Sequence, residues 1–320
     1  MSEKRRVVVT CPVREQVDDI LNREGLEVLY FDSEEPVEYG KIRDAVRDAH
    51  GLLCMLYDRI DAPLIDSAPN LRVISSVSTG LNHIDLDKVK ERGIVVTHTP
   101  GILTEATADL AWALLMATAR RVVEGDQFCR QGRFKGWRHH LLIGQDIHHS
   151  TLGIFGMGRI GSAIARRARG FHMRVIYHNR NRSPHEEEVG AELVEFETLL
   201  RESDHLLISA PLTPETQGRF GREEFRLMKP TATLINIGRG PIVKERELAE
   251  AIHSGEIWGA GLDVYEREPE IDELLFETPR VVLLPHLGSA SGDTRRRMAR
   301  AAASDLVSVL EGREPTYRAV

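Results

Sequence analysis

The 320-residue sequence contains only three cysteines, Cys11, Cys54 and Cys129, and they are far apart in the chain. Three scattered thiols support neither a disulfide framework nor a zinc site, so we expect buried, reduced thiols. The chain also lacks an apolar run approaching the roughly 20 residues that cross a bilayer. Its first residues lack the apolar segment of a signal peptide. These absences predict a cytoplasmic protein without a membrane partner.

An excess of basic residues is missing as well. Lys and Arg together number 42 against 49 Asp and Glu, which gives a formal net charge of −7. This balance argues against a general nucleic-acid binder. Hydrophobic residues make up 42% of the chain and charged residues 28%, as in globular proteins. A chain of this length is long for one domain and natural for two, so we expect two domains.

Short β-rich runs alternate with helical patterns along the whole chain. The first hundred residues predict five strands, at 6–10, 26–31, 51–56, 71–78 and 93–99. Seven more are predicted at 151–155, 173–178, 191–194, 205–210, 232–237, 259–264 and 280–286. Such alternation indicates parallel sheets that are covered by helices on both faces. We therefore expect an α/β fold of two doubly wound parallel-sheet domains with a cleft between them.

Two long helices are predicted outside this alternation. Residues 103–123 form a pattern that is apolar on nearly all sides, which is typical of a helix that is buried or lies between domains or subunits. Residues 291–312 form an amphipathic helix after the last predicted strand. That position lets the final helix cross back and pack on the first domain.

A glycine pattern follows the predicted strand 151–155. In G-x-G-x-x-G the first glycine permits a tight turn, the second lets the backbone approach a pyrophosphate, and the third allows close packing of helix on strand. The amino terminus of the following helix then faces the phosphates with its partial positive charge. The predicted dinucleotide-binding turn comprises Gly156, Met157, Gly158, Arg159, Ile160 and Gly161.

The acidic residue that usually follows about 20 residues after this turn is missing. Asn179 takes its place, and Arg180 and Arg182 follow. Loss of the carboxylate removes repulsion against a 2′-phosphate, and an arginine supplies a planar donor fork for it. The pattern favours NADP(H) as the cofactor, with NAD(H) as the alternative. Ordinary solvated arginines in a loop are the competing interpretation.

Polar residues follow three later strands at the edge where doubly wound folds place function. They are Arg239 between two glycines, Glu268 and His286. Hydride transfer to a keto acid needs a proton donor for the carbonyl oxygen, a fixed cation for the carboxylate, and a group that keeps the donor protonated. His286, Arg239 and Glu268 meet these needs in turn, because a carboxylate beside an imidazole favours its protonated form. Glu266 is the alternative to Glu268.

These segments together resemble the D-isomer-specific 2-hydroxyacid dehydrogenase family over essentially the whole chain, with the glyoxylate/hydroxypyruvate reductases as the nearest subgroup. The family's glycine-flanked Arg, the Glu of an E-P dipeptide and the His of P-H-x-G match Arg239, Glu268 and His286. The resemblance implies reduction of small 2-keto acids, such as glyoxylate and hydroxypyruvate, to D-2-hydroxy acids. It also implies a flavodoxin-like substrate domain of residues 1–99 and 288–320, and a Rossmann dinucleotide-binding domain of residues 100–287.

The resemblance implies further contacts with substrate and cofactor. The loop "SSVSTGLNHIDL" would hold the substrate carboxylate through the backbone N–H groups of Ser78, Thr79 and Gly80, together with Arg239, while His286 meets the carbonyl oxygen. Asn82 stands where the family usually has an aspartate, and we expect this position to serve the structure of the loop. The implied cofactor contacts are Asp263 at the nicotinamide carboxamide, Thr107 near the phosphates, Ala210, Pro211 and Thr216 on the adenine side, and Ile237, Gly238 and Gly288.

A homodimer is implied too, through the helix 103–123 and the segment after it, with Trp137 or a neighbour closing the partner's active site. Two other functions stay open: a D-3-phosphoglycerate or other D-2-hydroxyacid dehydrogenase, and a non-catalytic dinucleotide sensor that resembles transcriptional corepressors. A metal site is not expected, although His139-His140 and His148-His149 are adjacent pairs, because neighbouring side chains diverge and hydride transfer needs no metal.

Overall fold

The computed structural model describes residues 4–23 and 25–320. The chain divides into two compact units. Unit 1 comprises Met1–Leu103 and Ser289–Val320, and unit 2 comprises Thr104–Gly288. The boundaries expected from the sequence lay after residue 99 and before residue 288.

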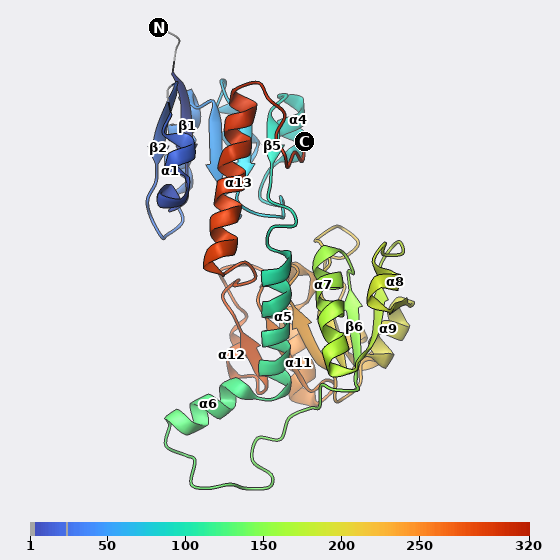
Figure 1. Ribbon diagram of the computed structural model, residues 1–320. Coiled ribbons are helices and arrows are strands. Elements are labelled where there is room, and N and C mark those ends of the chain that lie inside the picture. Colours follow the sequence, from blue (N-terminus) through green and yellow to red (C-terminus); the bar gives the residue numbers. More distant parts are fainter. Residues whose placement is uncertain (1–3, 24) are drawn as a thin grey trace. The chain divides into compact units, whose positions relative to one another are not determined.

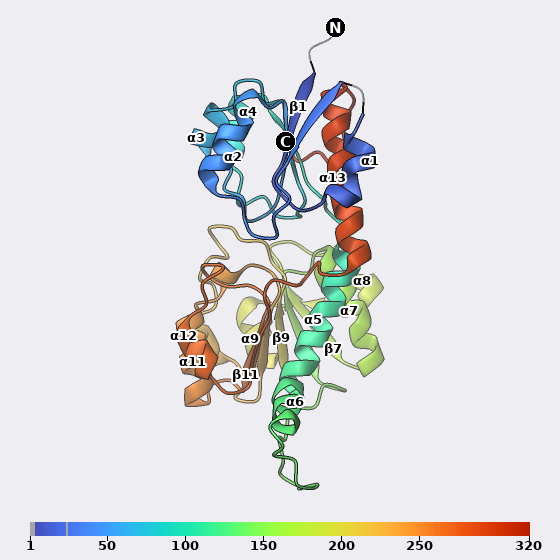
Figure 2. The same cartoon turned by 90° about the vertical axis from the view of Figure 1, so that its left-hand side faces the viewer.

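Unit 1 is built on a five-stranded parallel sheet whose central strands are buried and are covered by a helix layer on either face. Helices α1 and α13 cover one face and α2, α3 and α4 cover the other (Figure 2). The strand order is β2-β1-β3-β4-β5, the order of flavodoxin-like folds. The strands are β1 (Arg5–Val9), β2 (Leu26–Tyr30), β3 (Gly51–Cys54), β4 (Val73–Ser76) and β5 (Val95–Thr97). The helices are α1 (Arg14–Leu21), α2 (Tyr39–Ala45), α3 (Ala62–Asp66), α4 (Leu86–Glu91) and α13 (Gly292–Leu310).

The final helix α13 contacts α1, β3, β4 and β5, so it packs on the first sheet although it follows the last strand of the second. Its inward face is apolar, with Met298, Leu306 and Leu310 buried. The expectation that this helix returns to the first domain is confirmed.

Unit 2 is built on a seven-stranded parallel sheet of order β12-β11-β10-β9-β6-β7-β8. The order reverses between β6 and β9, and ligands of doubly wound folds bind at such a switch point. Helices α5 and α7 cover one face, and α9, α10, α11 and α12 the other (Figure 2). The strands are β6 (Thr151–Phe155), β7 (Arg174–His178), β8 (Ala191–Leu193), β9 (His205–Ile208), β10 (Thr233–Asn236), β11 (Gly259–Leu262) and β12 (Val281–Leu283). The helices include α7 (Arg159–Ala168), α8 (Glu186–Val189), α9 (Phe196–Glu202), α10 (Arg222–Leu227), α11 (Glu245–Ser254) and α12 (Glu273–Glu277).

The helix predicted over residues 103–123 is two helices. Helix α5 (Thr104–Ala119) ends where the Ala119 carbonyl accepts a hydrogen bond from the backbone N–H of Gln145 at 2.8 Å. Arg121 then adopts a left-handed conformation with φ 53°, and α6 (Val122–Arg130) begins. One face of helix α5 is buried within unit 2, where the helix contacts α7, β10, β11 and β12. The prediction of a single long helix was therefore wrong. The Ala119 carbonyl, which would accept the next hydrogen bond of a continuing helix, bonds the N–H of Gln145 instead.

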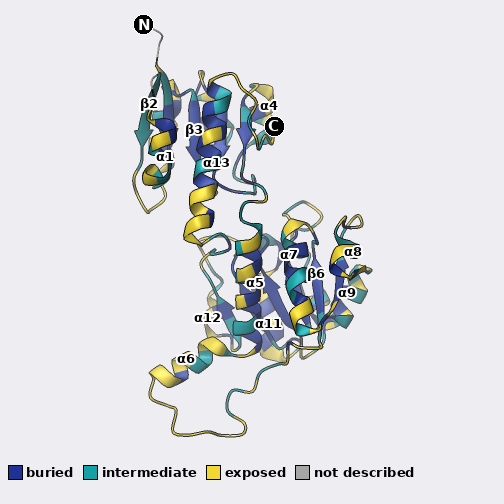
Figure 3. Cartoon of the chain, in the orientation of Figure 1, coloured by how far each residue is buried: buried dark blue, intermediate teal, exposed yellow. Residues whose placement is uncertain are grey.

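All twelve predicted strands are present, and two parallel-sheet α/β units confirm the predicted fold class. Figure 3 shows that most strands of the two sheets are buried, whereas the edge strand β2 is intermediate. Within the part of the chain that the structure describes, no helix has both the length and the apolar character needed to cross a membrane.

Candidate active site

The glycine turn after β6 leaves space where a cofactor phosphate would need it. A Cβ on Gly156, whose φ is +96°, would lie 2.5 Å from the Ala210 backbone, and one on Gly161 would lie 2.8 Å from the Gly156 carbonyl oxygen. These two glycines are therefore required by close packing. A Cβ on Gly158 would meet no atom within 4 Å. That space, at the amino terminus of α7, suits a pyrophosphate, so the residues present fit a dinucleotide.

Asn179 fastens the loop after β7 to this turn. Its Oδ1 accepts a hydrogen bond from the Met157 N–H at 2.7 Å, and its Nδ2 donates to the Met157 carbonyl at 3.2 Å. Arg180 is exposed and makes no hydrogen bond or ion pair with residues 4–23 or 25–320. Arg182 is already paired, because its Nη1 lies 2.5 Å from Glu186 Oε1. The two arginines therefore differ in their freedom to meet a ligand.

Arg239 follows β10 in a turn that is fixed by a buried asparagine. Asn236 accepts from the Gly238 N–H at 3.1 Å and donates to the Arg239 carbonyl at 3.2 Å. The Arg239 guanidinium donates to the Gly238 carbonyl at 2.7 Å. Burial lowers the pKa of Arg239, while the charge of Glu268 acts in the opposite direction. The guanidinium thus lies near the carboxylate of Glu268.

Glu268 and His286 are in direct contact. Glu268 Oε2 lies 2.8 Å from His286 Nδ1, and Glu268 Oε1 accepts from the Tyr265 N–H at 3.0 Å. Burial opposes ionisation of Glu268, but the hydrogen bond and charge of His286 lower its pKa below the usual value. Because a carboxylate only accepts, Nδ1 carries the proton in this bond and Nε2 is left for another partner. Glu266 turns elsewhere, since its Oε2 accepts from the Glu245 N–H at 3.0 Å.

Asp263 supports the chain just after His286. Its two carboxylate oxygens accept from the N–H groups of Leu287 at 2.7 Å and Gly288 at 2.9 Å. Thr107 on α5 donates to the Gly288 carbonyl at 2.9 Å. Burial raises the pKa of Asp263 to about 6, although the backbone donors oppose this shift. The buried Asp263 and Thr107 therefore fix residues 287 and 288 directly beside the candidate proton donor.

The residues expected on the adenine side lie in the loop after β9. Thr216 Oγ1 donates to the Pro211 carbonyl at 2.8 Å and accepts from the Thr213 N–H at 2.8 Å, which closes the loop on itself. Ala210 is buried against the glycine turn, and its carbonyl oxygen would lie 2.9 Å from a Cβ on Gly238. Ile237 is buried in the same region.

The expected substrate loop follows β4 in unit 1. Ser78 Oγ donates to the Gly80 carbonyl at 2.7 Å, and Thr79 Oγ1 donates to the Thr99 carbonyl at 3.2 Å. The backbone N–H groups of residues 78–80 have no acceptor among the described residues. Asn82 is exposed and makes no side-chain hydrogen bond there either, so side chains other than Asn82 hold the loop. Asn82 instead lines a pocket of about 370 Å³ formed by residues 57–61 and 82–85.

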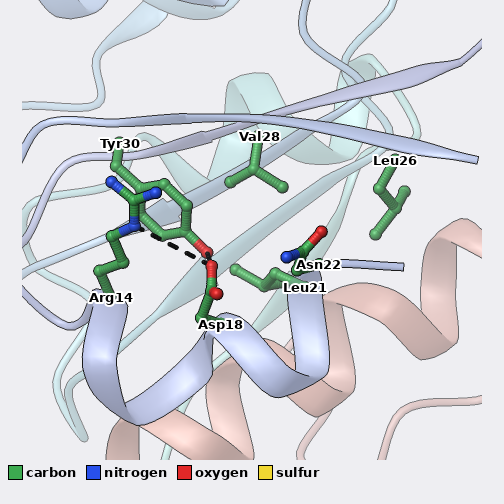
Figure 4. A pocket seen from close by; sticks show the side chains of 7 residues that line it. All are labelled: Arg14, Asp18, Leu21, Asn22, Leu26, Val28 and Tyr30. Atoms are coloured by element: carbon green, nitrogen blue, oxygen red, sulfur yellow. Dashed lines mark hydrogen bonds and ion pairs between the residues drawn. The ribbon is translucent and has the colours of Figure 1, made fainter. Parts of the chain in front are cut away.

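A second pocket of unit 1, of about 270 Å³, lies between α1 and β2 (Figure 4). Three of its polar side chains, Arg14, Asp18 and Tyr30, interact with one another. The Arg14 guanidinium lies 4.9 Å from the Tyr30 ring centroid, and the Tyr30 hydroxyl donates to Asp18 at 3.2 Å. None of the residues predicted to bind substrate or cofactor lines this pocket.

Helix α6 and the segment after it extend away from the sheet of unit 2 (Figure 1). Large apolar side chains are exposed there, with Trp137 81% accessible, Ile143 57% and Phe134 56%. Cys129 on α6 is also exposed, so the expectation of three buried thiols was wrong at this position. Only Phe128 is buried on α6, and the helix therefore offers Cys129 no core to enter.

The adjacent histidines of this region do not build a ligand set. His148 Nδ1 and His149 Nδ1 lie 3.1 Å apart, and the His139 and His140 rings meet edge to face. Within the described ranges, no group of three or more His, Cys, Asp or Glu side chains is placed to hold a metal ion.

Three supporting residues were not predicted from the sequence. Tyr265 donates from its hydroxyl to the Leu284 carbonyl at 2.8 Å, and its own carbonyl oxygen would lie 1.7 Å from a Cβ on Gly240. Glu245 is buried and accepts from the backbone of Glu266 and Asp272. Asn236 offered a signal, as a polar residue at the end of an apolar strand. Glu245 offered none, since it is one of several charges in "KERE".

Comparisons with known proteins agree with this architecture. Residues 112–288 match the sequence model of the "D-isomer specific 2-hydroxyacid dehydrogenase, NAD binding domain". A glyoxylate reductase of Thermococcus kodakarensis is 45% identical over 315 residues, which cover 97% of this chain and 94% of the relative.

Two solved structures are similar over nearly their full length. A protein from Thermus thermophilus has a TM-score of 0.92 and 45% identity, with 98% of this chain and all of that chain covered. An NADPH-dependent glyoxylate/hydroxypyruvate reductase from Sinorhizobium meliloti, in complex with NADP and malonate, has a TM-score of 0.87 and 31% identity. The match covers 99% of this chain and 97% of that chain.

Proposed function

The chain belongs to the D-isomer-specific 2-hydroxyacid dehydrogenase family, and from this premise we propose that it reduces small 2-keto acids, such as glyoxylate and hydroxypyruvate, to D-2-hydroxy acids. The observation that carries the proposal is the 2.8 Å contact between Glu268 and His286. The charge of Arg239 also acts on the carboxylate of Glu268. Relatives named glyoxylate reductase, 43–45% identical over almost the whole chain, support the substrate class.

His286 is the proton donor in this proposal. Its Nδ1–H is held by the carboxylate of Glu268, so Nε2–H is directed to the substrate's carbonyl oxygen and protonates it as the hydride arrives. The carboxylate of Glu268 also fixes the orientation of the imidazole before transfer. Arg239 holds the substrate carboxylate, and the N–H groups of Ser78, Thr79 and Gly80, which have no acceptor among the described residues, are further donors for it.

The cofactor that fits is a nicotinamide dinucleotide, which supplies the hydride when bound. Residues 156–161 would hold its pyrophosphate, Thr107 would lie near the phosphates, and Asp263 with Gly288 near the nicotinamide. Ala210, Pro211 and Thr216 would line the adenine, with Ile237 and Gly238 beside them. We propose NADP(H) as the preferred form and NAD(H) as the alternative, because Asn179 carries no charge and the unpaired Arg180 can receive a 2′-phosphate.

A homodimer in the cytoplasm completes the proposal. The exposed side chains of Phe134, Trp137 and Ile143 support an interface through α6 and the segment after it, since large apolar groups gather there. Size-exclusion chromatography with light scattering tests this point, and a monomer at micromolar concentration would refute it.

The test of the activity is the decay of NADPH absorbance with glyoxylate, hydroxypyruvate, pyruvate and 3-phosphohydroxypyruvate, repeated with NADH. We expect the fastest decay with glyoxylate or hydroxypyruvate. A preference for 3-phosphohydroxypyruvate would instead indicate a phosphoglycerate dehydrogenase. If no 2-keto acid is reduced with either cofactor, the enzyme proposal fails and a dinucleotide sensor remains.

A further inference from the structure

A carboxylate in α8 holds one of the two arginines that follow Asn179. Glu186 Oε1 lies 2.5 Å from Arg182 Nη1, and Glu186 Oε2 accepts from the Tyr177 hydroxyl at 2.6 Å. The Tyr177 hydroxyl in turn accepts from the Ser183 N–H at 3.0 Å. Both oxygens of Glu186 are therefore engaged, and the loop from 179 to 186 is tied to one phenol.

The three members of this chain of contacts differ in their freedom to move. Tyr177 is completely buried in the core of unit 2, and the Glu186 side chain is only 20% exposed. The Arg182 side chain is 71% exposed. The hydrogen bond from Tyr177 and the charge of Arg182 lower the pKa of Glu186, so it stays ionised at neutral pH. If the contact opens, Arg182 is the residue that moves and Glu186 is the one that stays.

We propose that Glu186 is a determinant of cofactor choice, which weakens the preference for NADPH by holding Arg182 away from a 2′-phosphate. This inference rests on the proposed function, in which residues 180–182 meet that phosphate. To bind the phosphate, the Arg182 guanidinium must first give up its ion pair with Glu186, and this exchange weakens the binding of NADPH. NADH has no 2′-phosphate and requires no exchange. Arg180 makes no hydrogen bond or ion pair with the described residues, although its charge contributes to lowering the pKa of Glu215, and it supplies the preference directly.

Glu186→Gln tests the inference, because glutamine keeps an acceptor for Tyr177 and loses the charge. The measured quantity is the ratio of the Kd of NADH to the Kd of NADPH, from fluorescence titration of the full chain. We expect this ratio to rise about two- to fivefold, the range that an exposed ion pair can produce. Glu187→Gln is the matched control: it makes the same charge change one residue away, on a side chain without a hydrogen bond or ion pair among the described residues. Its ratio should stay within about twofold of the parent.

Further variants identify Arg182 as the group released. Glu186→Ala, which also frees Arg182, should raise the ratio like Glu186→Gln. In Glu186→Gln combined with Arg182→Ala, the rise should disappear.

Each contrary result has a separate meaning. An unchanged or lowered ratio in both Glu186 variants overturns the inference, and so does a rise that persists without Arg182. Arg180→Asp tests the proposed function independently. If it lowers the ratio while the Glu186 variants do nothing, only this inference fails. If neither Arg180→Asp nor Arg182→Ala changes the ratio, the assignment of residues 180–182 to the phosphate fails as well.

Discussion

Replacing Glu268 by glutamine removes one negative charge and one acceptor oxygen with almost no change in size. In the native site one oxygen accepts from the Tyr265 N–H and the other bonds His286 Nδ1 at 2.8 Å. Glutamine offers only one acceptor oxygen, so one of these two bonds is lost. A hydrogen bond to a charged group contributes about 1.5–3 kcal/mol. Because the two side chains are 31% and 30% exposed, the lower part of this range applies, which predicts a roughly ten- to thirtyfold loss in kcat/KM.

The pH dependence of this loss separates charge from geometry. The contact with His286 lowers the pKa of Glu268, so the native carboxylate stays charged through the neutral range and loses its charge only at acid pH. Glutamine carries no charge at any pH, so the loss should be constant through the neutral range and should shrink at acid pH, where the native carboxylate is protonated as well. Continuous NADPH assays from pH 4 to 8 measure this dependence. Glu266→Gln in the same loop is the control, since Glu266 bonds the Glu245 N–H instead. Equal effects of the two variants, or a loss for Glu268→Gln that does not shrink at acid pH, would refute the assigned role of Glu268.

Other predictions concern the remaining groups of unit 2. His286→Ala should lower kcat by about 10² or more with a small change in KM. Arg239→Ala should lower kcat and raise KM. Full activity of His286→Ala would exclude His286 as the proton donor. Gly240→Ala should destabilise the fold by several kcal/mol, because the new Cβ would lie 1.7 Å from the Tyr265 carbonyl oxygen. Gly158→Ala meets no atom within 4 Å and should leave the urea midpoint unchanged while weakening NADPH binding; unaltered NADPH affinity would contradict the pyrophosphate assignment. Burial raises the pKa of Asp263 to about 6, above its unfolded value, so its contribution to stability increases as pH falls from about 7 to 4. The destabilisation by Asp263→Asn should therefore be larger at pH 5 than at pH 7.5 in urea titrations, and a pH-independent difference would contradict this cause.

The sheets could be predicted because each strand is a short β-rich run between helical patterns. The residue at which α5 ends could not be predicted from the sequence. Its carbonyl at Ala119 is satisfied by Gln145, which lies 26 positions along the chain and is invisible to a local pattern. The prediction that Cys129 is buried was wrong for a related reason. Whether the residues of α6 are buried depends on which other elements pack against the helix, and the sequence of α6 alone does not show this.

The candidate site shows the same division. Arg239, Glu268 and His286 stand out because each follows a predicted strand. Their supports depend on contacts between loops that are distant in sequence. Glu245 reaches the loop that carries Glu268 from the start of another helix, and its charge resembles that of its neighbours. The sequence offered Arg180 and Arg182 as equal candidates for the 2′-phosphate. The ion pair of Arg182 with Glu186 distinguishes them, and it too could not be predicted from the sequence.

The close approach of Gly240 to Tyr265 has a consequence for the energetics of turnover. The Tyr265 backbone contacts the turn that carries Arg239, bonds the carboxylate of Glu268, and is linked through its hydroxyl to the Leu284 carbonyl, two residues before His286. Cation, carboxylate and imidazole are thereby oriented by one residue when the chain folds. Little reorganisation energy is then left for the moment at which charge develops on the substrate oxygen, because the dipoles that stabilise it already point in their final directions.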